Sequence, residues 1–200
     1  MALLMKLTGV VEKVSRWMAW VGGVMILLSS LIIFVDVILR KLFNFSIGGA
    51  DELSGYALGI SVTWALSFAL VHRANVRIDA LYHLFPKRVG ALLDILSLLF
   101  LGAFVAVVAR FAFTTLSETI SFGSTANTPL QTPLVIPQGL WFAGFVVFLA
   151  VLLVYLVTSI AAFIRGDLDG VQRLCGVKSI SEEIDEEVSD EIRDVIHQER

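Results

Sequence analysis

Two pairs of charged residues have a spacing that suits specific chemistry. Asp36 and Arg40 are four residues apart, which places an acid and a base on one face of a helix and predicts an ion pair. Asp51 and Glu52 are adjacent and open an apolar stretch. An acidic pair at that position either caps the positive end of a helix or contacts a partner, and the sequence leaves both interpretations open.

A third acid and base lie inside one long apolar stretch. Ionisable groups within a membrane are candidates for proton relays or transport. Asp94 and Arg110 are therefore also candidate functional residues. Sixteen residues separate them, or about 24 Å along a helix, which excludes a mutual ion pair. Both are expected near the ends of their stretch, where long side chains reach the polar boundary.

Catalytic and cofactor-binding patterns are not apparent in the sequence. The three histidines, His72, His83 and His197, fall outside the apolar stretches, whereas a helical haem site needs imidazoles that face its interior. The single cysteine, Cys175, excludes an internal disulfide. With no glycine-rich phosphate loop and no nucleophile paired with a base, we expect neither an enzyme, nor a cofactor in this chain, nor a nucleic-acid partner.

The composition indicates what positions these charges. Apolar residues make up 57% of the chain and charged residues 16%, and mean hydropathy is +0.84, so most of this surface must face lipid. A bilayer core about 30 Å thick needs roughly 20 apolar residues in a helix. Four stretches meet that requirement, and an all-α membrane protein is predicted. The predicted spans are residues 20–39, 52–71, 89–113 and 137–164.

Orientation follows from the basic residues in the connections. Lys and Arg number 3 before the first span, 2 after it, 4 in residues 72–88 and 0 in residues 114–136. Positive charge favours the cytoplasm. Both termini are therefore predicted to be cytoplasmic, with residues 40–51 and 114–136 on the outside.

The remaining segments suggest helices that lie along the membrane and an acidic tail. In residues 1–19, apolar residues recur at helical spacing and basic residues form a polar side, which favours an interfacial helix. No cleavage site follows this segment. Residues 75–86 predict a second interfacial helix that Pro86 ends. Of the 18 acids and 15 bases, 11 and 4 fall in residues 167–200. Three regions are expected: the helix 1–19, a membrane domain 20–165 and a cytoplasmic tail 166–200.

Small residues on the second span predict close helix contacts. They form two ribbons at a spacing of four, and small side chains let helices approach closely in lipid. Either both ribbons pack inside this chain, or one serves a partner. The first ribbon is Gly55, Gly59, Thr63 and Ser67, and the second is Ala57, Ser61, Ala65 and Ala69. Between the last two spans, Pro129, Pro133 and Pro137 predict an extended loop that ends where Pro137 begins a helix.

These features together resemble a known family. The ordered segments "ILRKLFNFSIGGADELSGYALGISVTWALSFAL", "HRANVRIDALYHLFPKR" and "TPLVIPQGLW" are similar to the small, DctQ-like membrane subunit of tripartite ATP-independent periplasmic (TRAP) transporters, over roughly residues 20–165. Two features depart from the family: Asn75 stands where a histidine is frequent, and residues 166–200 have no recognised counterpart. The combination that carries the resemblance is Arg40 with Asn44, Asp51 with Glu52, the segment 75–86 and the proline-led fourth span.

The resemblance implies a function for the whole. In such systems an extracytoplasmic solute-binding protein delivers an organic anion to a large multi-span subunit, which moves it with a sodium gradient. The small subunit is a non-catalytic scaffold in the bacterial inner membrane, and any sodium belongs to its large partner. Glu52, Arg77 and Asp79 are expected to position it. The candidate partner-interface residues are Arg40, Asp51, Glu52, Gly55, Gly59, Arg77 and Asp79.

Two other functions are compatible with the sequence. One is a stand-alone membrane interaction protein whose acidic tail recruits a cytosolic factor, and the other is a small oligomeric channel. Loss of the tail would abolish the first function, and the second predicts conductance by the purified chain. The identity of the solute is not encoded in any pattern found here.

Overall fold

The computed structural model describes residues 2–74 and 85–176. Its described part is helical, and four of its helices are long and apolar enough to cross a membrane, which confirms the predicted all-α, four-span class. The side on which the termini lie stays a prediction. The helices are α1 (Ala2–Phe43), α2 (Ala50–Val71), α3 (Lys87–Phe122), α4 (Val135–Ile164) and α5 (Leu168–Cys175).

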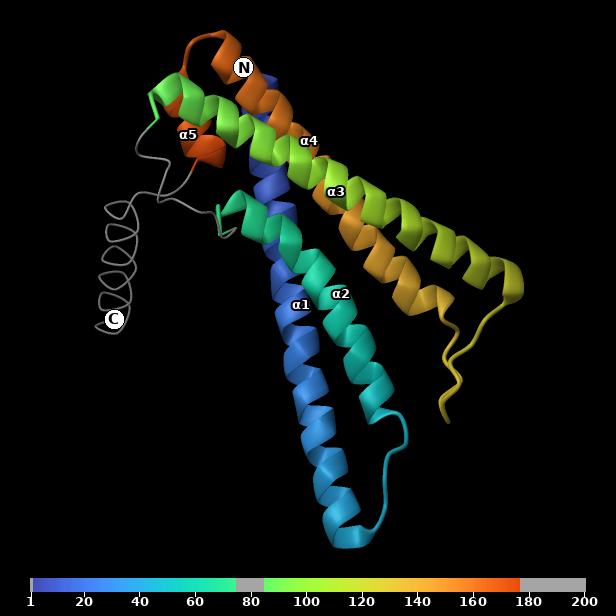
Figure 1. The fold of residues 1–200 in the computed structure, drawn as a ribbon. Helices are drawn as coiled ribbons and strands as arrows, with labels where there is room; N and C mark the ends of the chain where they lie inside the picture. Colours follow the sequence, from blue (N-terminus) through green and yellow to red (C-terminus); the bar gives the residue numbers. More distant parts are fainter. Residues whose placement is uncertain (1, 75–84, 177–200) are drawn as a thin grey trace, which may run out of the picture.

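The four long helices form two antiparallel pairs. α1 packs against α2, and α3 packs against α4. The second pair lies obliquely across the first, and α4 makes the contact with α2 between the pairs (Figure 1). We call the end with loops 44–49 and 123–134 the loop end, and the opposite end, with the start of α1 and with α5, the terminal end.

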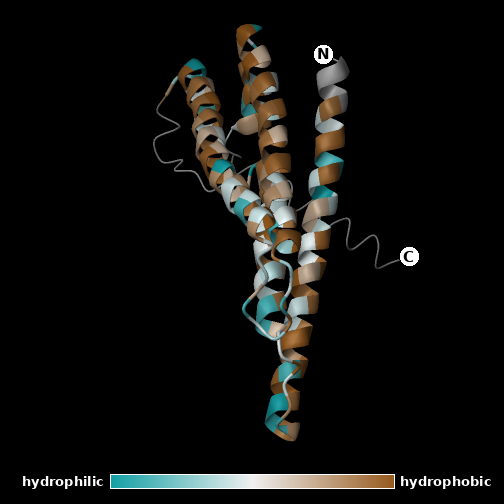
Figure 2. Ribbon diagram, turned by 90° about the vertical axis from the view of Figure 1, so that its right-hand side faces the viewer, coloured by the Kyte–Doolittle hydropathy of each residue, from teal (hydrophilic) through white to brown (hydrophobic). Residues whose placement is uncertain are grey.

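Most of the apolar surface points away from the protein. Figure 2 shows hydrophobic residues along the long helices. Only 11% of the most apolar stretch of α1 is buried within the chain, against 33% for α2 and for α4. Of the four spans, α1 is the least covered by this chain. Lipid or a partner must cover such surface.

α1 is longer than the predicted first span. It runs for 42 residues without a break at residue 19 or 20, so the predicted helix 1–19 and the predicted span 20–39 are one helix. Its length of about 63 Å at 1.5 Å per residue is twice the thickness of a bilayer core. An interfacial position for residues 1–19 stays a prediction.

The third span also continues beyond its predicted end at residue 113. α3 extends to Phe122, and Gly123 ends it in the left-handed conformation (φ 59°). Hydroxyl groups in this polar extension donate to backbone carbonyls of the preceding turn, as Thr114 does to Arg110 (3.1 Å) and Ser121 does to Ser117 (2.8 Å). Self-satisfied hydroxyls let the helix continue after the hydropathy falls, which is why the sequence pattern ended too early.

The short helix α5 was not predicted. Asp167 precedes it and accepts a hydrogen bond from the backbone N–H of Gly170 (2.8 Å), an N-cap that satisfies a free amide. Val171 and Cys175 are buried, and α5 packs against α3 and α4. The predicted tail 166–200 therefore begins with a segment that is packed onto the membrane domain. The remaining tail and the second interfacial helix lie outside the described residues.

The loop between α3 and α4 is not extended as predicted. Thr125 and Pro133 form an antiparallel bridge, and the backbone N–H of Ala126 donates to Thr132 O (2.9 Å). Gln131 takes a positive φ of 48° in the turn. The loop thus folds back on itself before α4 starts at Val135, two residues earlier than Pro137.

Small residues join the helices at two close contacts. Ser61 Oγ of α2 donates to Gly22 O of α1 (2.9 Å), and a Cβ on Gly22 would lie 3.2 Å from Ser61 Cα. On the other side of α2, a Cβ on Gly144 of α4 would lie 2.5 Å from Thr63 Oγ1. Each ribbon therefore has members that pack inside the chain, on α1 for Ser61 and on α4 for Thr63.

Replacing Gly144 by Leu should separate α2 from α4, because the new side chain would overlap with Thr63 and Trp64. Overpacking of this kind costs about 1–3 kcal/mol, measurable as a lower melting temperature of the purified protein in detergent. Gly139→Leu is the matched control, since nothing lies within 4 Å of a Cβ there. Equal melting temperatures for the two variants would show that the α2–α4 contact does not need a glycine.

Candidate functional site

Asp36 is the centre of a hydrogen-bonded cluster at the loop end. Its side chain is almost fully buried (3% exposed) and pairs with Arg40 through Nη2 at 2.5 Å, which confirms the predicted ion pair. Its second oxygen, Oδ1, accepts the backbone N–H of Ile47 (2.7 Å) and the hydroxyl of Ser46 (2.9 Å). The two contacts of Oδ1 hold loop 44–49 against the end of α1.

The end of α1 and the start of the loop follow from the sequence between these residues. Asn44 has a positive φ of 49°, a conformation that asparagine tolerates better than most residues. The chain reverses there and brings Ser46 and Ile47 back to Asp36. The spacing of Arg40 and Asn44 thus has a structural role, with Arg40 Nη2 also within 3.4 Å of Ser46 Oγ.

Glu52 holds loop 123–134 against the start of α2. It accepts the phenol hydroxyl of Tyr56 one turn along α2 (2.8 Å) and, on its other oxygen, the hydroxyl of Thr128 from loop 123–134. The loop descends from the ends of α3 and α4 to the start of α2 (Figure 1). Leu130 also lies so close to Gly49 that a Cβ there would be 2.3 Å from Leu130 Cδ1. Glu52 therefore has an internal structural role.

Asp51 differs from its neighbour. It lies in the first turn of α2, is exposed, and its carboxylate has no ion pair or hydrogen bond within residues 2–74 and 85–176. A carboxylate at the amino-terminal end of a helix is favoured by the helix dipole. The two acids of the predicted pair thus have different roles: Glu52 holds a loop in place, and Asp51 is exposed.

Gly55 and Gly59 lie one and two turns farther along α2. Gly55 is exposed and Gly59 is half-buried, and neither would place a Cβ closer than 3.9 Å to another residue. Grooves open on both sides of Gly55. One, of about 310 Å³, lies between α1 and α2, and the other, of about 250 Å³, lies between α2 and α4.

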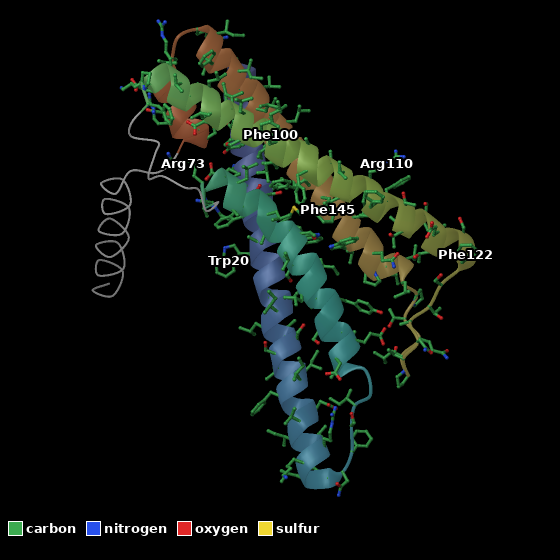
Figure 3. All side chains as sticks on the ribbon, in the orientation of Figure 1. Trp20, Arg73, Phe100, Arg110, Phe122 and Phe145 are labelled. Atoms are coloured by element: carbon green, nitrogen blue, oxygen red, sulfur yellow. The ribbon has the colours of Figure 1, made fainter. Side chains whose placement is uncertain are left out.

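Asp94 and Arg110, the acid and the base on α3, were expected to reach the polar boundary, and the structure places them differently. Asp94 is 3% exposed, because α4 and α5 both pack against α3. Arg110 is exposed and points away from α4 in Figure 3. It lies twelve residues before the end of α3 at Phe122, or about 18 Å along the helix. The two residues do not converge on a common site.

The terminal end is fastened by a contact between α3 and α5. Lys87 Nζ lies 2.9 Å from Asp169 Oδ1, and the hydrogen bond from this ammonium holds the pKa of Asp169 below its usual value. Both side chains are about two-thirds exposed, so solvent screens the pair and its stabilisation is small. The apolar contact through Val171 and Cys175 has the larger role in holding α5.

Two candidate residues, Arg77 and Asp79, lie outside the described residues. Arg40, Asp51, Glu52, Gly55 and Gly59 are all on α1 or α2, toward the loop end. Sequence reasoning missed the partners of the two fastened acids, Ser46 and Thr128, and it also missed Gln138 beside the second groove. A serine two residues before a glycine pair, Ser46 before Gly48 and Gly49, gave a weak local signal, and Thr128 gave none. In the described part of the chain, no group of three His, Cys, Asp or Glu residues is placed to hold a metal ion.

Replacing Asp36 by Ala should release loop 44–49, because the Ile47 amide and the Ser46 hydroxyl would lose their acceptor. We expect faster hydrogen exchange at the Ile47 amide and a melting temperature lower by several degrees. Asp36→Asn keeps one acceptor oxygen but removes the charge, so its exchange should be intermediate. Exchange as slow in Asp36→Ala as in the original protein would mean that the loop is held by other contacts.

A double-mutant cycle tests the contact between Glu52 and Thr128. Glu52→Gln and Thr128→Val should each lower the melting temperature, and the double variant should melt close to the lower of the two, because one interaction is lost in each case. Tyr56→Phe combined with Thr128→Val is the comparison pair, whose effects should be closer to additive. Fully additive effects of Glu52→Gln and Thr128→Val would exclude this contact as the joint between α2 and loop 123–134.

Comparison with known proteins gives one family match. The family model for the DctQ component of tripartite ATP-independent periplasmic transporters matches residues 29–162, a region that contains α2, α3 and nearly all of α4, as well as the Asp36 cluster. No curated protein and no solved structure matches the chain significantly. Because the family match covers well over half of the 200 residues, the protein belongs to the DctQ family, the small membrane component of TRAP transporters.

Proposed function

We propose that this protein is a non-catalytic scaffold for the large, substrate-moving subunit of a TRAP transporter that takes up an organic anion with a sodium gradient. The observation that carries the proposal is the use of two carboxylates at the loop end. At the loop end, Asp36 and Glu52 accept hydrogen bonds from their own loops, so they fasten the fold. The ion and anion sites then belong to the large subunit.

The form of the molecule supports a scaffold. Close contacts at Gly22 and at Gly144 join α1, α2 and α4, and interiors packed in this way resist deformation. A rigid subunit with a large uncovered apolar surface, such as that of α1, suits a platform against which another protein moves. Alternating access in secondary transporters is commonly a movement of one body against a second, fixed one.

The two joined loops support a place for the third component. Loop 123–134 contacts Glu52 at the start of α2 and lies against Gly49 of loop 44–49, and the charge rule predicts both loops on the outside. There they form a single fixed surface beside which an extracytoplasmic solute-binding protein can deliver its anion to the large subunit. In this proposal the chain is a multi-pass protein of the bacterial inner membrane with both termini in the cytoplasm.

Reconstitution into liposomes tests the proposal. The large subunit and this chain together, with the solute-binding protein outside and an inward sodium gradient, should take up solute, whereas this chain alone should transport nothing and conduct no ions. Omission of this chain should reduce uptake to the background level. Equal uptake by the large subunit with and without this chain would contradict the scaffold.

Removal of residues 177–200 separates the proposal from a stand-alone interaction protein. The truncated chain keeps helices α1 to α5, so most uptake should remain in the same liposomes. A complete loss of activity on truncation, with the large subunit still bound, would favour a function that resides in the acidic tail.

A further inference from the structure

An apolar groove of about 430 Å³ lies between α1 and α2, on the side of the terminal end. We call it the Trp20 groove, and its lining residues are Ala19, Trp20, Gly23, Val24, Leu27 and Phe68. All but Phe68 come from α1, and residues 19–27 extend about 12 Å along that helix. The groove therefore follows the axis of α1 and offers only apolar contacts.

Exposed tryptophans place one end of this groove at the membrane boundary. Trp20 is 72% exposed, and Trp17, three residues before it, is 62% exposed. Figure 3 shows Trp20 projecting away from the helices. Tryptophan is enriched where headgroups meet hydrocarbon, and the apolar stretch of α1 continues from Trp20 toward the loop end. The groove thus begins at the headgroup level and runs into the hydrocarbon region.

Two basic residues lie just beyond the boundary end of the groove. Arg16 is four residues before Trp20 and Lys13 is seven residues before it, and these spacings bring all three to one face of a helix. Arg16 pairs with Glu12 (2.7 Å), although its side chain stays 57% exposed. Lys13 is exposed and has no ion pair within residues 2–74 and 85–176. One positive charge at the mouth of the groove is therefore not balanced by this part of the chain.

The surroundings of the groove mouth are basic as well. The exposed and half-exposed bases of the described terminal end are Lys13, Arg16, Arg73, Lys87, Arg88, Arg165 and Arg173, against the acids Glu12, Asp167 and Asp169. The charge rule predicts this end on the cytoplasmic side, where the membrane surface is negative. A phospholipid has the same order of features as the site: a phosphate at the boundary, followed by an apolar chain that runs into the membrane.

We propose that the Trp20 groove binds an acyl chain of an anionic phospholipid, whose phosphate contacts Lys13 and Arg16. The ammonium and guanidinium groups donate to the phosphate oxygens, and the chain covers apolar surface that this protein leaves exposed. One unbalanced base near the membrane surface predicts a preference of roughly fivefold for an anionic over a zwitterionic lipid with the same chains. The site is independent of the proposed scaffold function.

Quenching of tryptophan fluorescence by brominated lipid tests the proposal. The full chain is reconstituted in phosphatidylcholine bilayers that contain a small fraction of phosphatidylglycerol with brominated acyl chains, or the same fraction of brominated phosphatidylcholine. The signal of Trp20 is the difference between the original chain and Trp20→Phe. Half-maximal quenching of this signal should need roughly fivefold less brominated phosphatidylglycerol than brominated phosphatidylcholine. Equal quenching by the two lipids would overturn the proposal.

Two pairs of charge variants test where the phosphate binds. Lys13→Gln combined with Arg16→Gln should remove the preference for phosphatidylglycerol. Lys41→Gln combined with Arg110→Gln is the matched control, because it removes two other exposed bases of α1 and α3, and it should keep the preference. Loss of the preference in both pairs, or in neither, would overturn the assignment of the phosphate to Lys13 and Arg16.

A pair of glycine variants tests where the acyl chain binds. Gly23→Leu should fill the groove and remove the preferential quenching of Trp20 by phosphatidylglycerol. Gly55→Leu should not, although Gly55 is equally exposed and a Cβ at either glycine would meet nothing within 4 Å. Melting temperatures equal to that of the original chain verify that the variants fold. Unchanged quenching in a folded Gly23→Leu variant would overturn the location of the chain.

Cross-linking identifies the occupant when the large subunit is present. A photoreactive residue in place of Trp20, in a chain co-expressed with the large subunit of the same transporter, should cross-link to phospholipid. A cross-link to the large subunit or to a second copy of this chain would overturn the assignment of the groove to lipid. That result would leave the scaffold function intact, so the two proposals fail separately.

Discussion

The loop end of the molecule depends on carboxylates that accept hydrogen bonds from the loops beside them. At a membrane boundary an ionised acid without partners is unfavourable, and so is a loop amide without an acceptor. Asp36 resolves both problems for loop 44–49, since it accepts from Ile47 and Ser46 while Arg40 balances its charge. Glu52 does the same for loop 123–134 through Thr128. The first helical pair thus has its own turn fixed to it by Asp36, and the turn of the second pair is fixed to α2 of the first pair by Glu52.

Below the loops, the helices are held by contacts that tolerate little change. Thr63 approaches Gly144 on one side of α2, and Ser61 approaches Gly22 on the other. In lipid there is no hydrophobic driving force between helices, so such close packing and the hydrogen bonds beside it provide the association energy. The indole of Trp64 adds a bond to Leu140 O (3.0 Å). α2 is therefore the central element, with α1 and α4 packed on two of its faces.

Local features of the fold could be predicted from the sequence, and long-range ones could not. Hydropathy located the four spans, and a spacing of four predicted the pair of Asp36 and Arg40, because both depend on neighbours along one helix. Thr128 lies 76 residues from Glu52, and no local pattern marks that contact. The end of α3 was misplaced for a related reason: its last turns are stabilised by hydroxyl groups that bond to their own backbone, which hydropathy does not record. The division of roles within Asp51 and Glu52 required the position of the second loop.

The same contacts explain why one face of α2 remains free. In this chain α1 and α4 occupy two directions around α2. The third direction contains Gly55, with Leu58 and Val62 exposed beyond it. Internal packing placed small residues where α2 meets its own neighbours, at Ser61 and Thr63. The small residue in the third direction, Gly55, does not pack on a neighbouring helix of this chain. The two acids nearby also face different directions: Glu52 faces the chain's own loop, and Asp51 faces outward. α2 thus holds the fold together on two faces, and this chain leaves its third face uncovered.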